Sequence, residues 1–589
     1  MRKASAIQYF KHYLAPYWRG MLVMIVLSLL SVVFEVVAPL FMGREVTALA
    51  QYVAAYRAGK RITIGAFQVN LKLMILMYSM FLLLLLASWL IAVRINSFAN
   101  HDMRVNLFKK FQRLTIKYFD THQDGKLLSL FTSDLDNIFN ALNNAIFELI
   151  AQVAIFAGTI WLMLRVNVQL ALVTMALTPV ALLVTVILMR KSKKYIDLQQ
   201  EKISALNGYV NEQINGQKVI ITNGLQQQSI AGFNRYNDEV RTAMFKGQLY
   251  SGMLNPLLQG LSYLNLAIVI AVGSVIVMNS GISRSVGLGL IVTFVQFSQQ
   301  YFSPLTQLAS IYSQIQLALT GAKRIDQVEI QPEEDQVPTG QNLAPLTKKV
   351  AVVDAHFGYQ PDKEILHGID LNIPQGTMLA LVGPTGSGKT TVMNLFNRFY
   401  DVDQGCVTID EQDVRTLTLK SLRSRIGIVF QDSVLFTGTV AFNIKFGKPA
   451  ATDEEMIAAA QQANIHDYIM TLPQGYATEI DGEQGIFSTG QKQLLSIART
   501  LLTDPDFLIL DEATANVDTV TEAKIQAAMD NIIAGRTSFV IAHRLKTIIN
   551  ADQIAVLKDG NVVEQGNHAE LLAQKGFYYK LYTNQMVLD

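Results

Sequence analysis

The stretch Gly383-Pro384-Thr385-Gly386-Ser387-Gly388-Lys389-Thr390 decides the fold of the half of the chain that contains it. It has the form G-x-x-x-x-G-K-[ST] of a phosphate-binding loop. The apolar run 378–382 before it predicts a buried strand, and residues 391–396 after it predict the start of a helix. Glycines let backbone N–H groups curl round an anion, and the helix N-terminus adds partial positive charge. We therefore expect a nucleoside triphosphate here, with Lys389 on its β- and γ-phosphates and the Thr390 hydroxyl on Mg²⁺.

The composition indicates that this soluble half is joined to a membrane half. Of the 589 residues, 50% are hydrophobic and 16% are charged, which is too apolar for an ordinary soluble protein. The mean hydropathy of +0.26 is nevertheless modest, as expected for an average over two unlike halves. A net charge of +2 argues against a nucleic-acid partner, and a single cysteine, Cys406, excludes an intramolecular disulfide.

Six apolar stretches approach the ~20 residues that a membrane-spanning helix needs. The connections 95–144 and 190–256 are long, polar and helix-prone, whereas 165–169 and 279–285 are very short. We therefore expect an all-α transmembrane domain of six helices, with two long helical hairpins on one side. The predicted spans are Met21–Met42, Leu71–Val93, Ala145–Leu164, Leu170–Met189, Leu257–Met278 and Val286–Leu308.

Each long hairpin is interrupted by a pair of residues that breaks its helical pattern. These pairs are Asp124-Gly125 and Asn215-Gly216. A short transverse helix beside each break could dock onto a soluble domain, and an ordinary loop tip is the alternative.

Both chain termini are expected on the cytosolic side. An even number of spans puts the two ends on one side, and the nucleotide site must face cytosolic ATP. Arg57, Lys60 and Arg61 after the first span oppose this orientation, but the cations of the two long hairpins support it. Residues 5–18 are aromatic and amphipathic, which favours a helix in the membrane interface over a soluble surface helix. The hairpin cations are Lys109, Lys110, Arg113, Arg190, Lys191, Lys193 and Lys194.

Two features of the spans could concern a transported compound. Glu35 lies inside the first span, where an ionisable group is costly and is either functional or paired with a neighbouring helix. In and beyond the sixth span, polar residues recur at helical spacing and form a stripe. The stripe favours a water-filled cavity, and hydrogen bonding between helices or simple solvation is the alternative. Its members are Thr293, Gln296, Gln300, Ser303 and Gln307.

In the soluble half, Phe507-Leu-Ile-Leu-Asp511-Glu512 predicts a buried strand that ends in two carboxylates. Strands of a parallel sheet present their carboxyl ends to ligands. Asp511 is therefore expected to bind Mg²⁺ opposite Thr390, and Glu512 to orient and polarise the attacking water.

Three further residues are expected near the nucleotide. Gln431 ends the strand-like run 426–431 and could reach Mg²⁺ and the attacking water. His543 follows the run 539–542 and could donate a hydrogen bond to the γ-phosphate. Tyr359 precedes the phosphate loop, where its ring could stack on adenine.

Phe487-Ser488-Thr489-Gly490-Gln491 precedes a helix at 492–502 and, with these motifs in this order, identifies a family. The stretch from about Val350 to the C-terminus resembles the ATPase domain of ABC transporters. The six spans and two long hairpins resemble an ABC exporter half-transporter. The resemblance implies an α/β P-loop ATPase domain with an α-helical signature subdomain, which hydrolyses ATP with Mg²⁺. It also implies two such domains that sandwich two nucleotides, each between the Walker motifs of one chain and the signature of the other.

The resemblance assigns roles to individual residues. Tyr359 looks like the adenine-stacking residue, 383–390 like Walker A, Gln431 like the Q-loop, 478–483 like the exporter X-loop, 507–512 like Walker B, 515–518 like the D-loop, and His543 like the switch histidine. The residues expected to hold nucleotide are Tyr359, 383–390, Thr391, Ser488, Gly490 and Gln491, those for Mg²⁺ are Thr390, Gln431 and Asp511, and the catalytic residues are Glu512, His543 and Gln431.

The domain boundaries follow from the same patterns. Residues 331–341 form an acidic run with Pro and Gly, which is typical of a linker. We expect an interfacial elbow helix at 1–18, a transmembrane domain at 19–328, a linker at 329–346 and an ABC ATP-binding domain at 347–589. By resemblance, the transverse helices near Gly125 and Gly216 couple ATP binding to the spans.

The chain departs from the family at its signature, which is usually Leu-Ser-Gly-Gly-Gln. Here Phe487 replaces the Leu and Thr489 replaces the first Gly, and the D-loop has Ala-Asn-Val-Asp instead of Ser-Ala-Leu-Asp. The Walker motifs, Glu512 and His543 are intact. This asymmetry resembles the chain that carries the catalytic Glu in bacterial heterodimeric multidrug exporters, so a non-identical partner is favoured over harmless drift in a homodimer.

The predicted function is ATP-driven efflux of small hydrophobic or amphipathic compounds by one half of a bacterial ABC exporter in the cell membrane. A homodimeric lipid flippase or a peptide exporter is an alternative within transport. A regulatory membrane ATPase that moves no compound is an alternative from another class, although no additional sensor domain is visible in the sequence.

Overall fold

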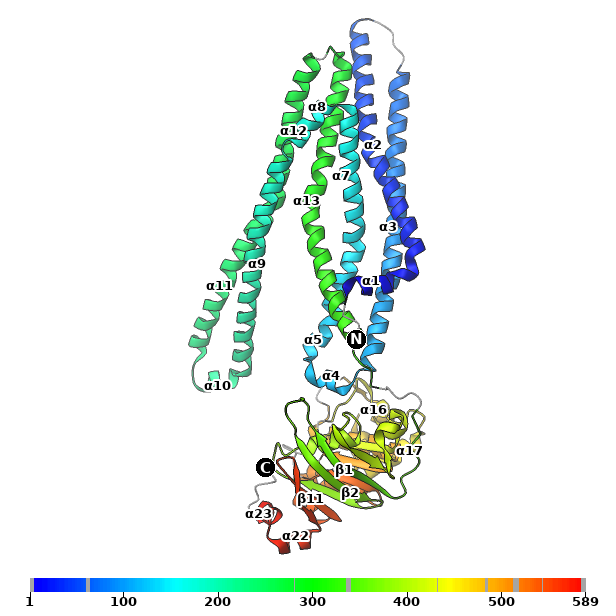
Figure 1. Cartoon of the computed structure of the whole chain (residues 1–589), viewed down its shortest axis with the longest axis vertical. Helices are drawn as coiled ribbons and strands as arrows, with labels where there is room; N and C mark the ends of the chain where they lie inside the picture. The colour runs from blue at the N-terminus through cyan, green and yellow to red at the C-terminus, as the bar shows by residue number, and fades with distance from the viewer. Residues whose placement is uncertain are drawn as a thin grey trace. The chain divides into compact units, whose positions relative to one another are not determined.

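The structure, a computed structural model, describes residues 5–59, 64–279, 281–334, 340–431, 433–481, 486–511, 519–542 and 544–583. It divides into two compact units (Figure 1). The first comprises residues 1–112 and 124–331, and the second comprises residues 113–123 and 332–589. The short segment 113–123 of the first hairpin therefore packs with the second unit and not with the helices that flank it.

The described part of the first unit is helical throughout. Its helices are α1 (Ala6–Leu14), α2 (Trp18–Arg57), α3 (Gly65–Phe111), α5 (Asp124–Ser129), α6 (Leu135–Asn140), α7 (Ile146–Val166), α8 (Val168–Met175), α9 (Thr178–Asn215), α10 (Gln217–Thr222), α11 (Gln226–Gly252), α12 (Leu254–Asn279) and α13 (Arg284–Glu329). Within the described residues, five helical runs are long and apolar enough to cross a membrane, and they contain the first five predicted spans. The sixth predicted span lies in α13, which is long enough but less apolar because of its polar stripe.

The fourth predicted span, Leu170–Met189, is interrupted, which the apolar pattern did not predict. The helix breaks between α8 and α9, and α9 begins with Pro179 in its first two positions. Proline has no N–H to donate to the preceding turn, so it suits the start of a helix better than its interior.

Helix α1 is attached to the polar ends of two long helices. The Tyr13 hydroxyl donates to Glu329 Oε1 at 2.6 Å, and the Ser5 N–H donates to Asp326 Oδ2 at 2.7 Å. Beyond α1, the Tyr17 hydroxyl donates to Asp102 Oδ2 at 2.8 Å. These contacts fix the start of the chain to α13 and α3.

The polar stripe of α13 serves to hold helices together. Thr293 Oγ1 donates to the Gly289 carbonyl at 2.9 Å and also lies 3.3 Å from the carbonyl of Pro39 in α2. Gln300 Nε2 donates to the Glu35 carbonyl at 2.9 Å. Gln307 Oε1 accepts from Gln152 Nε2 of α7 at 2.8 Å. Three of the five stripe residues thus make the interhelical contacts that were the alternative to a cavity lining.

Helices α9 and α11 form a long hairpin that packs chiefly on itself, with α10 at its tip (Figure 1). Both ends of the hairpin lead into apolar helices, through α8 on one side and α12 on the other. As expected, helical structure surrounds the break at Asn215-Gly216: α9 ends at Asn215 and α10 begins at Gln217.

The second unit contains a six-stranded sheet in the order β12-β11-β3-β10-β9-β6. All neighbours in this sheet are parallel except β12, which is antiparallel to β11. The strands are β3 (Met378–Val382), β6 (Ile426–Val429), β9 (Phe507–Asp511), β10 (Thr537–Ile541), β11 (Gln553–Lys558) and β12 (Asn561–Gly566). Every residue of β3, β9 and β10 is buried, as expected of parallel strands covered on both faces.

A second, antiparallel sheet has the order β2-β1-β4-β5. Its strands are β1 (Lys349–Phe357), β2 (Leu366–Pro374), β4 (Gln404–Ile409) and β5 (Gln412–Asp413). Leu379 and Leu381 of β3 pack into the core shared with this sheet, whereas Met378, Ala380 and Val382 pack into the core on the opposite face. This alternation places β3 between two hydrophobic layers, and the loop that follows begins where the strand leaves them.

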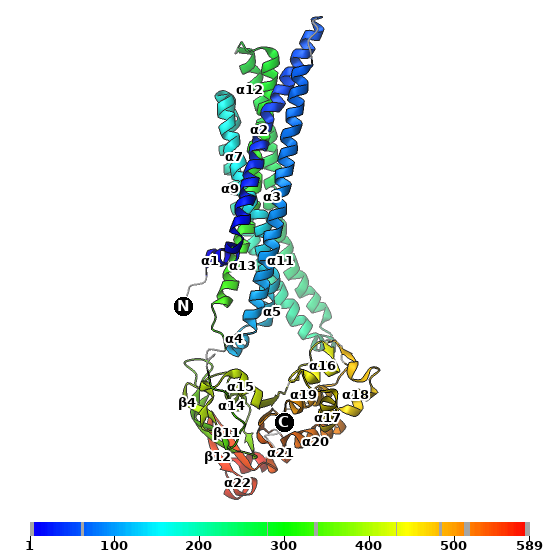
Figure 2. The same ribbon diagram turned by 90° about the vertical axis from the view of Figure 1, so that its right-hand side faces the viewer.

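The helices of the second unit fall into two groups. Helices α16 to α20 gather on one side and α14, α15 and the antiparallel strands on the other (Figure 2). A two-stranded antiparallel sheet pairs β7 (Gly438–Thr439), which precedes α16, with β8 (Glu479–Ile480), which follows α18. The predicted fold class, a helical transmembrane domain followed by an α/β domain with a helical subdomain, is confirmed. The helices are α14 (Lys389–Phe396), α15 (Leu419–Arg425), α16 (Val440–Lys445), α17 (Asp453–Gln462), α18 (His466–Thr471), α19 (Thr489–Thr503), α20 (Thr519–Ile533), α21 (Leu545–Ile549), α22 (His568–Gln574) and α23 (Phe577–Thr583).

Helix α4 (Ile116–Thr121) lies beside the predicted break at Asp124-Gly125. Ile116 packs against the core of the antiparallel sheet, and the Tyr400 hydroxyl donates to Asp120 Oδ2 at 2.5 Å. The Glu334 N–H also donates to the Arg113 carbonyl at 2.7 Å. A short helix therefore lies beside this break, as expected, and it contacts the soluble domain.

Candidate functional site

The glycine-rich loop 383–388 joins the buried strand β3 to helix α14. Gly388 has φ +106°, in the left-handed region that favours glycine, and occupies the N-cap position of the helix. A Cβ at Gly383 would collide with the Leu557 carbonyl oxygen, so only glycine fits there. Over Gly386, in contrast, the space is open. The loop is therefore held against the sheet at its first residue and leaves room for a ligand at its middle.

Lys389 is the buried cation of this loop. Its ammonium donates to the Gly383 carbonyl at 2.8 Å and to the Pro384 carbonyl at 3.1 Å. Burial lowers the pKa of Lys389, and the nearby Asp511 carboxylate opposes that shift. The cation thus lies within the loop, bonded to neutral carbonyl oxygens that an anionic ligand can replace.

Ser387 supplies an independent indication of a ligand. Its side chain is 3% exposed, and among the described residues its hydroxyl has no hydrogen-bond partner. A buried hydroxyl without a partner is costly, whereas phosphate oxygens would accept its hydrogen bond. The loop therefore fits a triphosphate.

The parallel sheet brings the other predicted residues to the edge where the loop lies. Asp511 is the last residue of β9, pairs with Ile541 of β10 and is 8% exposed. Gln431 follows β6, on the other side of β9, and is exposed. Because β3, β10, β9 and β6 are neighbours and parallel, their carboxyl ends meet at one edge. Glu512 directly follows Asp511 and His543 follows β10 by two residues, but both lie outside the described residues.

The chemistry of this edge also suits Mg²⁺, which uses one or two carboxylates together with phosphate oxygens and water. Thr390 and Asp511 would hold the ion, with Gln431 in reach, and the bound ion would neutralise charge on the transferring phosphate. Among the described residues, no group of three or more His, Cys, Asp or Glu side chains is placed to hold a metal by protein ligands alone.

Tyr359 is fixed to the helix that follows the phosphate loop. Its hydroxyl accepts from Asn394 Nδ2 at 3.1 Å and lies 3.4 Å from Thr391 Oγ1. Its ring meets Tyr400 edge-on, with centroids 4.9 Å apart and planes at 85°. Phe357 makes a similar contact at 5.1 Å. These contacts hold the proposed adenine-stacking ring in one orientation.

The sequence analysis did not identify the residues that support Tyr359. Asn394 approaches Tyr359 from α14, and Tyr400 approaches it from the turn after that helix. Asp120, which bonds Tyr400, is 280 positions away in the chain. The run Phe399-Tyr400-Asp401 after a predicted helix was the only available signal, and it has no period or spacing that indicates a function.

The signature segment begins helix α19. Ser488 is its N-cap and forms a capping box with Gln491, in which each side chain bonds the other residue's backbone N–H. Gly490 is buried and Thr489 is the exposed first residue of the helix. Phe487 is 4% exposed and packs edge-on against Tyr468 at 5.7 Å in the core of the helical subdomain.

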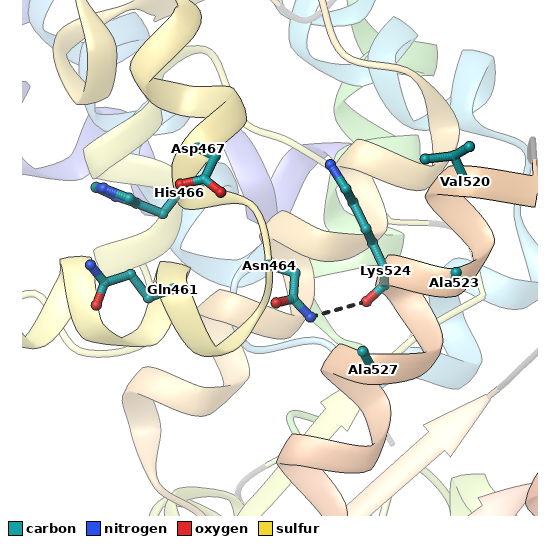
Figure 3. Close-up of a pocket in the computed structure, with 8 residues that line it drawn as sticks. All are labelled: Gln461, Asn464, His466, Asp467, Val520, Ala523, Lys524 and Ala527. Atoms are coloured by element: carbon teal, nitrogen blue, oxygen red, sulfur yellow. Dashed lines mark hydrogen bonds between the residues drawn. The ribbon is translucent and has the colours of Figure 1, made fainter.

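A pocket of about 740 Å³ lies elsewhere in the second unit, between the α17–α18 connection and α20 (Figure 3). Asn464 Nδ2 donates to the Lys524 carbonyl across it at 3.3 Å. It contains none of the predicted site residues. A nucleotide site shared between two chains is only half present in one chain, so its half need not form a deep pocket by itself.

Comparison with known proteins agrees with these features. The ABC transporter transmembrane region matches residues 21–305, and the ABC transporter family of ATPase domains matches residues 366–515. An uncharacterized ABC transporter ATP-binding protein of Bacillus subtilis is 37% identical over 96% of this chain and 92% of its own length.

This chain is an ABC transporter.

Other similar proteins carry more specific names. A fatty acid ABC transporter ATP-binding/permease protein of Mycobacterium bovis is 40% identical over 81% of the transporter and 75% of its own length. An ATP-dependent lipid A-core flippase of Chromohalobacter salexigens is 33% identical over 99% of both chains. A solved bacterial Atm1-family ABC exporter with ATP bound superposes with a TM-score of 0.75, at 27% identity, over 97% of the transporter and 98% of that chain.

The transporter is therefore a multi-pass membrane protein in which a transmembrane domain is fused to an ATPase domain that binds ATP. It has the exporter fold and hydrolyses ATP in connection with transport. Members of this family act as dimers of such halves.

Proposed function

We propose that the transporter exports hydrophobic or amphipathic compounds across the bacterial cell membrane, with its ATPase domain and both termini in the cytosol. One observation carries the proposal: helices long and apolar enough to span a bilayer are joined in one chain to a phosphate loop with a buried lysine and a buried serine hydroxyl that has no partner among the described residues. Such a chain can convert ATP binding into rearrangement of its membrane helices.

In the proposed mechanism, each residue of the site has a separate task. Lys389 leaves the loop carbonyls to neutralise the β- and γ-phosphates, and the Ser387 hydroxyl donates a hydrogen bond to a phosphate oxygen. Tyr359, held by Asn394 and Tyr400, stacks on adenine. Glu512 orients the attacking water, with Gln431 and His543 beside it.

The remaining contacts come from a second ATPase domain. The exposed start of α19, with Ser488, Gly490 and Gln491, would close over the nucleotide of the partner chain. Its N-terminal N–H groups suit a γ-phosphate because the helix dipole favours negative charge there. Ser488 and Gln491 already fix this turn through their capping box, so little order is lost on closure.

Partner identity is a separate part of the proposal. We favour a non-identical half-transporter because Thr489 puts a β-branched residue where close approach to the γ-phosphate is wanted. Phe487 no longer contributes to this argument, since it is a buried core residue where Phe and Leu serve the same purpose. The D-loop, 515–518, lies outside the described residues.

A lipid flippase is the second candidate function. One similar protein is named a lipid A-core flippase and another a fatty acid transporter. Lipids are amphipathic, so a flippase would use the same ATPase site, and the two candidates differ only in the compound moved. A regulatory ATPase that moves no compound was the alternative of another class, and the match of both domains to transporter families counts against it.

Transport in inside-out vesicles tests the proposal. Vesicles that contain the transporter and its partner should accumulate a fluorescent amphiphile when ATP is added, and Glu512→Gln should abolish accumulation because no carboxylate orients the water. Fluorescent phospholipids reconstituted in the same vesicles test the flippase. ATP hydrolysis without movement of any probe would favour the regulatory ATPase and refute export.

A further inference from the structure

The start of the second long hairpin carries a group of cations that outnumbers the nearby acidic residues. Arg190, Lys191, Lys193 and Lys194 follow the predicted end of the fourth span at Met189. Lys246 lies on α11, which packs against α9. One acidic residue lies close to them in the sequence, Asp197 of α9, three residues after Lys194. Five positive charges thus share a short length of the hairpin with a single negative charge.

Two stacked tyrosines organise these cations. The rings of Tyr195 and Tyr250 lie 5.4 Å apart with their planes at 13°, one from each helix. Lys191 Nζ is 5.2 Å from the Tyr250 ring, Lys246 Nζ is 5.7 Å from the Tyr195 ring and Lys194 Nζ is 6.0 Å from it. Cation–π attraction favours this arrangement over three freely extended side chains. We call Lys191, Lys194, Tyr195, Lys246 and Tyr250 the basic-aromatic patch.

The helices are in close contact beneath the patch. Ser192 and Gly247 are both buried, and they lie between the patch residues on α9 and on α11. The patch therefore rests on a packed pair of helices, while its three lysines are exposed.

Further from the spans, other cations of the same hairpin have acidic partners. There Lys202 Nζ lies 2.9 Å from Glu239, Arg241 lies 3.4 Å from Asp238, and Arg235 lies 3.9 Å from Glu239. These cations have acidic partners within the hairpin. The largest group of cations in the hairpin therefore lies at the end that adjoins the apolar helices.

Apolar side chains are exposed next to the patch. Ile187 and Met189 precede it on α9, with 45% and 37% of their surface exposed. Leu249 of α11 and Met253, which directly follows that helix, lie towards the fifth span, with 42% and 40% exposed. A ligand that satisfies both kinds of surface has an anionic head and hydrocarbon chains. Tyr and Lys at the end of a spanning helix also lie at headgroup level.

We propose that the basic-aromatic patch binds the headgroup of an anionic phospholipid of the cytosolic leaflet, with the acyl chains along the exposed apolar residues of α9 and α11. The phosphate diester oxygens accept hydrogen bonds from Lys191, Lys194 and Lys246. The site does not depend on which compound is exported. Juxtamembrane groups of four or more Lys and Arg are a recognised means of binding anionic lipid.

The test is lipid binding by the full-length transporter, in the assembly in which it purifies, measured by native mass spectrometry in detergent. Phosphatidylglycerol is the probe and phosphatidylcholine the neutral comparison. The wild type should prefer phosphatidylglycerol. Combined Lys191→Gln, Lys194→Gln and Lys246→Gln should weaken phosphatidylglycerol binding about fivefold per cation, on the order of a hundredfold in total, and leave phosphatidylcholine binding unchanged.

A matched control removes the same number of charges from the same hairpin. Combined Lys202→Gln, Arg235→Gln and Arg241→Gln should leave phosphatidylglycerol binding within about twofold of wild type, because these cations lie away from the patch. Tyr195→Phe with Tyr250→Phe keeps both rings and should behave as wild type, whereas Tyr195→Leu with Tyr250→Leu should bind several-fold more weakly.

Several results would overturn the proposal. Equal binding of the two lipids by the wild type would show no anionic preference, and equal losses in the patch and control variants would show only a general charge effect. Displacement of the lipid by excess inorganic phosphate would identify a site for soluble anions. A patch variant that dissociates into single chains but retains phosphatidylglycerol would show that this surface is a contact between chains. If the patch variant misfolds, the Phe and Leu pairs still decide the question.

Discussion

At the scale of single residues, Lys389 is the side chain on which nucleotide binding depends most. It is 8% exposed and bonded to two loop carbonyls, and its pKa is lowered mainly by burial. A buried ammonium of this kind is stabilised when phosphate oxygens replace neutral carbonyls, because charged hydrogen bonds are stronger.

Lys389→Ala should therefore weaken ATP binding by a factor on the order of ten to one hundred, the value of one or two charge-assisted hydrogen bonds. The exposed Lys420 of the same domain provides the control, and Lys420→Ala should leave affinity unchanged. Equilibrium titration of the full-length transporter with a fluorescent ATP analogue measures both variants. Equal affinity in all three proteins would contradict the assignment of the phosphate loop.

At the scale of secondary structure, the β1–β2 hairpin carries Tyr359 in its connecting loop, and a charged contact joins the two strands where that loop begins and ends. His356 Nδ1 of β1 lies 2.6 Å from Glu364 Oε1, while His356 Nε2 lies 3.4 Å from Asp354. His367 Nδ1 of β2 lies 3.3 Å from the second oxygen of Glu364. The hydrogen bond to Glu364 raises the pKa of His356 above its ordinary 6.5, and the one from His356 lowers the pKa of Glu364 below 4.5.

These shifts give the hairpin a pH dependence with a defined sign. The His356 contribution is complete below pH 6.5 and is lost as pH rises through its raised pKa, and the Glu364 contribution is lost as pH falls through its lowered pKa. Amide hydrogen exchange of residues 357–366 should therefore be slower in wild type than in His356→Gln near pH 6, and the difference should shrink at alkaline pH. A difference that is constant with pH would assign His356 a purely steric role.

Helix α4 belongs to the same scale, because one hydrogen bond joins it to the ring that supports Tyr359. Burial, and then the Asp120 carboxylate, raise the pKa of Tyr400, so its hydroxyl stays protonated and donates at neutral pH. Tyr400→Phe removes that bond but retains the edge-on contact with Tyr359. ATP affinity should then stay within about twofold, while stimulation of ATP hydrolysis by transported compounds falls severalfold.

Tyr400→Leu separates the two roles of this residue. It removes both the hydrogen bond and the ring, so ATP affinity should fall together with stimulation. ATPase assays with and without a transported amphiphile, together with ATP titrations, measure the two effects. If Tyr400→Phe lowered ATP affinity as much as Tyr400→Leu, the hydroxyl would support the site itself and not the contact with α4.

At the scale of the whole molecule, the open question is which chain completes the nucleotide site. In a homodimer, both sites would combine an intact Walker motif with a signature that contains Thr489. With a different partner whose signature is intact, one site would combine this chain's Glu512 with the partner's signature. The other site would combine the partner's Walker motifs with this chain's signature, which contains Thr489. The exposed position of Thr489 at the start of α19 is compatible with either arrangement.

Steady-state rates of ATP hydrolysis decide between the homodimer and the pair of different chains. They are measured for the transporter alone, for the transporter with its partner, and for that pair carrying Thr489→Gly. The transporter alone should be slow, the pair fast, and Thr489→Gly should change the rate of the pair by less than about twofold. In the transporter alone, the same substitution should raise the rate, because it restores close approach to the γ-phosphate. Full stimulated turnover by the transporter alone would exclude the need for a different partner.

The sequence by itself determined the elements whose signal is local. The phosphate loop was predicted because glycine, lysine and threonine at fixed spacing have few other uses, and β3 and β9 because continuous apolar runs of this length are typical of buried parallel strands. The spans were predicted because a bilayer requires about 20 apolar residues. The break at Pro179 was missed because an apolar count does not register the missing N–H of proline.

Only the tertiary structure decided which distant side chains meet. It showed that Gln300 and Gln307 hold α13 to α2 and α7, and that Phe487 is a core residue. It also connected Asp120 to Tyr400 and joined Tyr195 to Tyr250 across two helices. The physical reason is the same in each case. Such contacts depend on how whole helices and sheets pack, and packing acts between residues whose separation along the chain contains no periodic signal.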